Sequence, residues 1–303
     1  MNRIALAAVI FCFSIRAISA QAPGVPVYDE TRLKRVDAAA KKAAVELQKA
    51  GSLLAFDKVA EQLEARKHCK LKLPAPGKEK LAPRDLWNRA RQSHLRIGWL
   101  FHDHEKPRWQ INLAGGYVIS GDGAVATCYH VVEPHESEMK DGWLIAATDD
   151  DKVYPVTEIL AASHDTDTCI LRVKADKLTA LPLGTDVAPG DAVVCFSEPM
   201  GRRGFYSTSI VNRFVQRPVM PLRKRDTPPE QLPVFLEVGN DWAPGSSGAA
   251  VLDLCGNAVG QVATIESIVD EGDPSQKKKS LFPGTVIVFH DAICARHVKE
   301  LVK

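Results

Sequence analysis

The sequence predicts a mainly β fold over its larger part, from about residue 85 onward. There, short runs of β-branched and apolar residues alternate with Gly, Pro, Asp and Asn. Many short strands separated by turn residues are typical of a sandwich or barrel. The expected strands are residues 97–101, 116–120, 124–127, 143–148, 169–173, 192–196, 234–238, 249–254, 258–263 and 285–289.

Two of the connections between these runs carry strong turn signals. Gly121-Asp122-Gly123 lies between two apolar runs and predicts a tight hairpin, and Cys255-Gly256-Asn257 predicts another. At the C-terminal end, residues 291–303 suit a short helix with Asp291 as its cap.

The region before the strands has a helical pattern instead. Residues 29–67 are rich in Ala, Leu, Lys, Glu and Arg, and their apolar residues recur at helical spacing on both sides of Gly51-Ser52. We therefore expect a helical hairpin within residues 21–69, followed by a Pro-rich linker over 70–84. The hairpin suits an oligomerisation arm, a partner-binding element or, as we favour, a bracket packed on the next domain.

The first twenty residues resemble a secretory signal peptide. Arg3 supplies positive charge, residues 4–13 are apolar, and Ala20 offers a small-residue cleavage site. Cleavage there predicts a secreted or periplasmic protein. The alternative is an uncleaved N-terminal anchor, which would be the chain's one contact with a membrane.

Composition gives no global sign of nucleic acid or an acidic membrane surface as a partner. The chain has 45% hydrophobic and 25% charged residues, an ordinary globular balance, and a net charge of +2 from 39 basic and 37 acidic residues. This balance gives no indication of nucleic-acid binding. The basic runs at 223–225 and 277–279 are expected to be solvated loops.

Cysteine usage fits an exported protein. Cys12 would leave with the signal peptide, and the remaining thiols can pair in fifteen ways. Cys128 and Cys169 each lie two residues from a candidate catalytic group, so we favour a disulfide between them; the alternative is a set of small buried thiols. The six remaining cysteines are Cys69, Cys128, Cys169, Cys195, Cys255 and Cys294, and their spacing matches no zinc pattern.

Three residues carry the chemistry of acyl transfer. His130 ends a strand-like run, Asp167 opens another, and Ser247 lies between glycines just ahead of a third. A serine hydroxyl needs a base within hydrogen-bond reach, and the base needs a carboxylate to hold its tautomer. His130 would take the proton of Ser247, and Asp167 would accept the other N–H of His130.

The oxyanion that forms in such a reaction needs donors that are already in place. Gly245 tolerates the unusual backbone angles that bring its N–H beside that of Ser247, so these two amides are the expected oxyanion hole. The reaction needs no cofactor or metal. His102-Asp103-His104 is interpreted as a solvent-exposed loop rather than a metal site.

With these residues in place, the chain resembles a trypsin-like serine protease, and most of all the HtrA/Deg branch. The matching segments, over roughly residues 85–303, are 115–123 with 127–132, 167–173, 190–201 and Pro244-Gly245-Ser246-Ser247-Gly248. The resemblance implies two perpendicular six-stranded β-barrels with the catalytic residues between them. The first barrel would carry His130 and Asp167, and the second would carry Ser247.

Several positions depart from the family pattern. Ala249 stands where a second glycine is usual, and Cys128-Tyr129 replaces a smaller pair before the histidine. Ser246 stands where digestive trypsins have an aspartate that pairs with a newly cut N-terminus, so that activation switch is not expected. The family-like region extends to residue 303, so no PDZ domain is expected after it, and neither is peptide-regulated assembly of the usual HtrA kind.

Substrate preference rests on Asp241, six residues before Ser247. In trypsins, an aspartate at that spacing selects Arg or Lys, whereas HtrA-type enzymes prefer small aliphatic residues; alternatively, Asp241 caps a turn. Trp242 either lines the specificity pocket or is a half-buried aromatic residue.

Together these features predict an exported serine endopeptidase that acts on protein or peptide substrates through an acyl-enzyme. The alternative is a protease-fold protein that binds peptides or partners and cleaves them poorly or not at all. The substitutions at Tyr129 and Ala249 and the helical arm favour the alternative, whereas the three catalytic residues favour the enzyme.

Overall fold

The fold was analysed in a computed structural model of the chain. The structure describes residues 26–28, 33–105, 108–135, 137–175, 177–219, 228, 232–270 and 284–303. The signal peptide predicted over residues 1–20 and the basic runs at 223–225 and 277–279 lie outside these residues.

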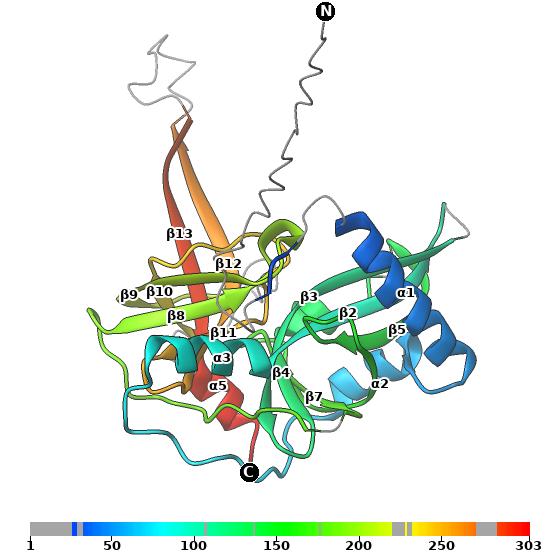
Figure 1. The fold of residues 1–303 in the computed structure, drawn as a ribbon, viewed down its shortest axis with the longest axis horizontal. Helices are drawn as coiled ribbons and strands as arrows, with labels where there is room; N and C mark the ends of the chain where they lie inside the picture. Colours follow the sequence, from blue (N-terminus) through cyan, green and yellow to red (C-terminus); the bar gives the residue numbers. More distant parts are fainter. Residues whose placement is uncertain are drawn as a thin grey trace, which may run out of the picture.

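The first half of the β region closes into a six-stranded barrel (Figure 1). The hydrogen-bonded order is β5-β2-β3-β4-β7-β6, and pairing between β5 and β6 closes it. Gly123 N donates to Ser120 O at 3.1 Å in the predicted hairpin between β3 and β4. The strands are β2 (His94–Asp103), β3 (Trp109–Ser120), β4 (Ala124–Thr127), β5 (Met139–Ala147), β6 (Val153–Ser163) and β7 (Thr168–Val173).

The second half forms another closed barrel beside the first, in the order β10-β13-β12-β11-β8-β9. The predicted turn at 255–257 joins β11 and β12. Figure 1 shows that β12 and β13 extend well beyond the barrel as a two-stranded ribbon. The strands are β8 (Ala192–Ser197), β9 (Phe205–Gln216), β10 (Val234–Val238), β11 (Ala250–Asp253), β12 (Ala258–Asp270) and β13 (Gly284–Cys294). Two six-stranded barrels preceded by helices are therefore confirmed as the fold.

The predicted helical hairpin corresponds to α1 (Leu33–Lys49) and α2 (Phe56–Ala65), joined through the two-residue strand β1 (Leu54–Ala55), which pairs with β5. Both helices lie on the outer side of the first barrel (Figure 1). Val59 and Leu63 of α2 are buried in the first barrel's core cluster. Of the three roles proposed for the hairpin, the packed bracket is the one these contacts support.

The segment predicted as a linker is fastened along much of its length. Gly77 N donates to Asn257 Oδ1 at 2.7 Å, and Leu81 N donates to Leu254 O at 2.9 Å. Its last two residues begin α3 (Pro83–Ser93), which the sequence analysis missed because Pro83 reads as a loop residue. Proline is in fact favoured in the first turn of a helix, where its missing N–H costs nothing.

A hydrophobic cluster shared by both barrels holds them together. Tyr117 and Ile170 from the first barrel meet Phe196 and Leu252 from the second, and Leu86 of α3 covers them. Fully burying one side chain of this size contributes roughly 1.5–3 kcal/mol, so the shared cluster fixes how the barrels sit. It thereby fixes the relative position of any residues that the two barrels contribute to one site.

Three expectations differ from the structure. The C-terminal helix is α5 (Ala295–Glu300), with Cys294 at the N-cap position and no side-chain cap; Asp291 lies within β13 and pairs with Arg217. The predicted Cys128–Cys169 disulfide is wrong, because both residues are buried free thiols. Strands β6 and β9 were missed. In β9 polar residues interrupt the apolar ones, and all side chains but one are at least partly exposed, so the apolar run that marks a strand is absent.

No helix in the described part of the chain is long and apolar enough to cross a membrane.

Candidate active site

His130 is presented by a single helical turn at the end of a barrel strand. β4 ends at Thr127, and α4 (Tyr129–Val132) follows after Cys128. Tyr129 and Val132 are buried and anchor the turn, while His130 is half-buried at its surface. This arrangement holds the imidazole in place and leaves one edge of the ring accessible.

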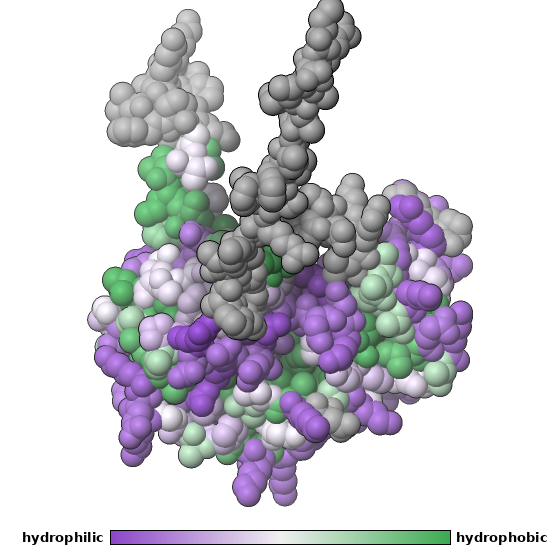
Figure 2. All heavy atoms as spheres, viewed as in Figure 1, coloured by the Kyte–Doolittle hydropathy of each residue, from purple (hydrophilic) through white to green (hydrophobic). Residues whose placement is uncertain are grey.

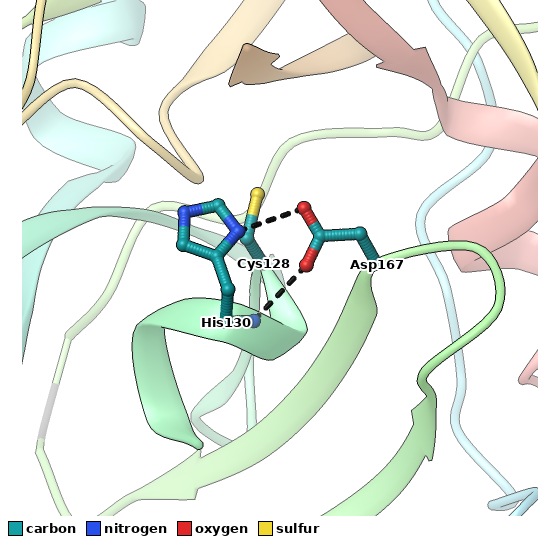
Figure 3. A group of neighbouring side chains, drawn as sticks. All are labelled: Cys128, His130 and Asp167. Atoms are coloured by element: carbon teal, nitrogen blue, oxygen red, sulfur yellow. Dashed lines mark hydrogen bonds and ion pairs between the residues drawn. The ribbon is translucent and has the colours of Figure 1, made fainter. Parts of the chain in front are cut away.

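Asp167 holds the opposite edge of the imidazole (Figure 3). Its carboxylate accepts a hydrogen bond from His130 Nδ1 at 2.8 Å and another from the backbone N–H of His130 at 3.0 Å. Asp167 is fully buried and has a φ of 49°, a left-handed conformation that aspartate tolerates better than most residues. Two hydrogen bonds to one residue fix both the ring orientation and the tautomer of His130.

The carboxylate also changes the proton affinity of the base. Burial alone would lower the pKa of His130, but the hydrogen bond and negative charge of Asp167 outweigh it, so the pKa of His130 is raised above its usual range. A raised pKa makes the imidazole a stronger base and stabilises the imidazolium that forms after proton transfer.

Gln261 of β12 secures the dyad from the second barrel. Its side-chain amide Nε2 donates to Asp167 O at 3.1 Å and to Thr127 O at 3.2 Å. Sequence reasoning missed this residue. The sequence does hold a signal for it, because Gln261 is a single amide side chain within the apolar run 258–263. A polar group buried in such a run needs hydrogen-bond partners.

Ser247 lies on a sharp turn before β11. Gly245 has a φ of +99°, and a Cβ there would lie 2.8 Å from Glu198 O, so only glycine fits. Ser246 N donates to Ala243 O at 3.0 Å within the turn. Gly115 N of β3 donates to Ser247 O at 2.7 Å, which ties the turn to the first barrel. Gly115 belongs to one of the segments that resemble the family, but the sequence did not predict its hydrogen bond to Ser247.

His130 and Ser247 line the same pocket, of about 250 Å³, together with Pro244 and Gly245. Asn112 and Leu113 of β3 also line this pocket. Among the described residues no hydrogen bond joins Ser247 Oγ to His130, and catalytic hydrogen bonds often tighten only when substrate binds. The backbone N–H groups of Gly245 and Ser247 make no hydrogen bond within the described chain, so both remain available to an acceptor.

Cys128 is the third side chain beside the dyad (Figure 3). Its Sγ, the imidazole and the carboxylate lie within 4.8 Å of one another, which is a spacing that a metal ion would accept. However, the thiol donates to Val262 O at 3.1 Å, and burial raises its pKa well above 9.0. Metal ligation requires a thiolate, so this group fits a proton relay with a structural thiol better than a metal centre.

The two residues proposed for substrate selection lie elsewhere. Asp241 is exposed and lines a different pocket, with Arg213, Glu237 and His290 among its neighbours. Trp242 is 4% exposed in the core of the second barrel, where Nε1 donates to Thr264 O at 3.1 Å. Neither residue is among those lining the pocket that contains Ser247.

The departures from the family pattern are accommodated without blocking the pocket. Tyr129 points into the first barrel and packs edge-on against His164, with ring centroids 5.1 Å apart. Ala249 is fully buried in the second barrel's core, and a Cβ on Gly115 would lie 2.6 Å from its backbone nitrogen. The glycine at 115 therefore makes room for Ala249.

Comparisons with known proteins agree with the class that fold and site define. The model of the trypsin-like peptidase domain matches residues 114–260, so this part of the chain is similar to trypsin-like peptidase domains.

The curated relatives that this chain resembles are of the HtrA/Deg kind. The chain is 28% identical over 154 residues to a probable periplasmic serine endoprotease, DegP-like, of Halomonas elongata, and 30% identical over 161 residues to one of Brucella suis. These matches cover 49% and 52% of this chain, but only 28% of each relative's length.

Solved structures share the fold. The HtrA-type protease AlgW with a decapeptide has a TM-score of 0.53 at 16% identity, covering 73% of this chain and 66% of AlgW. An AlgW structure with a tripeptide has a TM-score of 0.52 at 18% identity, covering 73% and 62%. The resemblance to trypsin-like proteases of the HtrA/Deg branch is thus confirmed.

Proposed function

We propose that this chain is an exported serine endopeptidase that hydrolyses peptide bonds through an acyl-enzyme at Ser247. The observation that carries the proposal is the 2.8 Å hydrogen bond between His130 Nδ1 and Asp167, on a histidine that shares a pocket with Ser247. A dyad oriented in this way has the chemistry of a general base directed at a hydroxyl nucleophile.

The acylation step uses each of these groups once. His130 accepts the proton of Ser247 as Oγ attacks the substrate carbonyl, and Asp167 stabilises the imidazolium that results. The amides of Gly245 and Ser247 donate to the oxyanion. His130 then passes its proton to the leaving amine as the peptide C–N bond breaks, which leaves an ester on Ser247.

Deacylation repeats the sequence with water as the nucleophile. His130 accepts a proton from water, the resulting tetrahedral intermediate collapses, and Ser247 recovers its proton as the acid product leaves. The residues supply every proton transfer, so the proposed mechanism requires no cofactor.

Location and substrate follow from two further points. The predicted signal peptide and the relatives named as periplasmic support export to the periplasm or beyond. The AlgW structures hold peptides, which supports a protein or peptide substrate here. Oligomerisation through the N-terminal helices stays a hypothesis.

A fluorophosphonate probe tests the proposal directly, because it labels only an activated serine. We expect the wild type to be labelled and Ser247→Ala to be unlabelled. Ser246→Ala is the matched control, because it removes the neighbouring, fully buried hydroxyl and should still be labelled.

A second pair of variants tests the base. His130→Ala should abolish labelling, whereas His68→Ala, at an exposed histidine, should leave it unchanged. Folded wild-type protein that resists the probe, with no cleavage of a peptide library, would favour the alternative of a peptide-binding protein that does not cleave.

A further inference from the structure

The short segment 26–28 contacts both barrels through one side chain. Tyr28 OH donates to Asp149 Oδ2 at 2.9 Å, in the turn between β5 and β6 of the first barrel. Its ring lies against Gly204, which precedes β9 of the second barrel, because a Cβ on Gly204 would be 2.3 Å from ring atoms. Neighbouring Val27 is 76% exposed, so Tyr28 is the residue that anchors this segment.

Next to Tyr28, a cluster of largely buried charged side chains connects the turn between β5 and β6 with the segment before β9. Arg91 Nε lies 2.7 Å from Asp149 Oδ2, and Arg203 Nη2 lies 2.6 Å from Asp151 Oδ1. Arg96 pairs with Asp151 as well, and its Nε lies 3.8 Å from Glu198 Oε1. The side chains of Arg96 and Arg203 are 3% and 6% exposed, so solvent screens these pairs little.

The loop that these charges hold, residues 198–204, is also in contact with the turn that carries the nucleophile. Met200 N donates to Pro244 O at 2.7 Å. A Cβ on Gly245 would lie 2.8 Å from the backbone carbonyl oxygen of Glu198, so this carbonyl is packed directly against the turn. A shift of this loop would therefore move the backbone on which the Gly245 and Ser247 amides lie.

We propose that Tyr28 is a positioning residue, which clamps the 198–204 loop against the first barrel and so holds the Gly245–Ser247 turn in its reactive geometry. The inference rests on the proposed endopeptidase function. It gives the chain just after the predicted signal peptide a role in catalysis without any contact with substrate.

The chemistry of the contact supports a fixed clamp. Burial, with the charge of Asp149 adding to it, raises the pKa of Tyr28 to about 12, so the hydroxyl stays a donor throughout the working pH range. Removing the Tyr28 hydroxyl leaves the mostly buried carboxylate of Asp149 with one hydrogen-bond donor fewer. This costs more free energy than losing a solvent-exposed hydrogen bond. Gly204 has no side chain to fill the space that the ring would leave.

The test measures the rate of fluorophosphonate labelling and the kcat of peptide cleavage. Tyr28→Ala should lower both about tenfold, since a hydrogen bond to a charged group is commonly equivalent to a factor of this size. Tyr28→Phe, which keeps the ring, should lose less, and Val27→Ala should match the wild type. KM should change little, because Tyr28 does not line the pocket that contains Ser247.

Gly204→Ala gives an independent check. The added methyl would displace the Tyr28 ring, so the substitution should slow labelling in the wild type more than in the Tyr28→Ala background. Equal effects in both backgrounds would contradict the proposed contact.

Hydrogen exchange separates this inference from the proposed function. In Ser247→Ala protein, Tyr28→Ala should speed exchange of amides in residues 198–204 and 244–247, with no comparable change around His130. Labelling and exchange both within twofold of the parent protein would overturn the clamp. If the wild type is never labelled, the endopeptidase proposal fails, and the exchange result alone then decides whether Tyr28 holds the loop.

Discussion

The two barrels contribute to the candidate site in different ways. The first barrel holds His130 and Asp167 through side-chain hydrogen bonds in a buried setting, directly at the ends of strands. The second barrel presents Ser247 on a turn whose shape depends on Gly245 and on the neighbouring loop 198–204. His130 is thus fixed by specific side-chain chemistry, and Ser247 by backbone shape. Substitutions in the two barrels should therefore fail for different reasons.

The largest effect is expected in the first barrel, from Asp167→Asn. Asparagine can still accept from the backbone N–H of His130, but it favours the wrong tautomer of the imidazole, and kcat should fall by about 10⁴. The matched control is Asp165→Asn, whose side chain is 51% exposed, and it should stay within twofold of the wild type. Equal losses from both substitutions would mean that the carboxylate of Asp167 has no special role.

The pH dependence of the wild type tests the same side-chain chemistry. His130 acts as a base only when neutral, and Asp167 raises its pKa. Activity should therefore increase with pH through a midpoint above 6.5, and it should be lost below that midpoint. A pH–rate profile of kcat/KM with a midpoint clearly below 6.5 would contradict this electrostatic account.

In the second barrel, Gly245→Ala should act through backbone shape alone. Its Cβ would lie 2.8 Å from Glu198 O, so the turn must move, and labelling should slow by about 10²–10³, as when one oxyanion donor is lost. Gly190→Ala is the control, because φ is also positive there, at +94°, but nothing lies within 4 Å. Labelling of the control at the wild-type rate would separate the clash from backbone strain.

A smaller effect is expected where the barrels meet. His94 is fully buried against Phe196, and burial lowers its pKa to about 4. In the unfolded chain, His94 binds a proton near pH 6.5, whereas in the folded chain its side chain stays neutral until about pH 4. Stability should therefore fall as the pH drops through this window, by on the order of 3 kcal/mol.

Denaturant titrations at pH 7 and pH 4 measure this loss in the wild type and in His94→Leu. The variant should lose less stability over the window, whereas His68→Leu, at an exposed histidine, should lose as much as the wild type. Identical losses in all three proteins would remove His94 from the explanation.

The smallest effect is expected from Asp241→Asn. Asp241 is exposed and lines a pocket that contains neither Ser247 nor His130, so the cleavage-site profile should change less than twofold. A large loss of cleavage after Arg and Lys would instead assign Asp241 to the specificity pocket, as its spacing in the sequence suggests.

Sequence reasoning reached the parts of the molecule that local patterns encode. The runs at 124–127 and 234–238 match β4 and β10, because buried strands carry mostly apolar sequences. The candidates His130, Asp167 and Ser247 stood out because each lies next to such a run.

Features that depend on contacts distant in sequence could not be found in this way. The hydrogen bonds of Gln261 span 94 and 134 positions of the chain, and those of Tyr28 span 121. No spacing rule links residues so far apart. The predicted Cys128–Cys169 bond failed for a related reason, since being near the same site does not give two thiols the geometry of a bond.

The bridge made by Gln261 has a mechanical consequence. Its amide belongs to one barrel and its acceptors, Thr127 O and Asp167 O, to the other, so the proposed proton path depends on a contact between two halves of the chain. A molecule nicked in the 174–191 crossover, or assembled from separately produced halves, would regain turnover only when that seam had closed again.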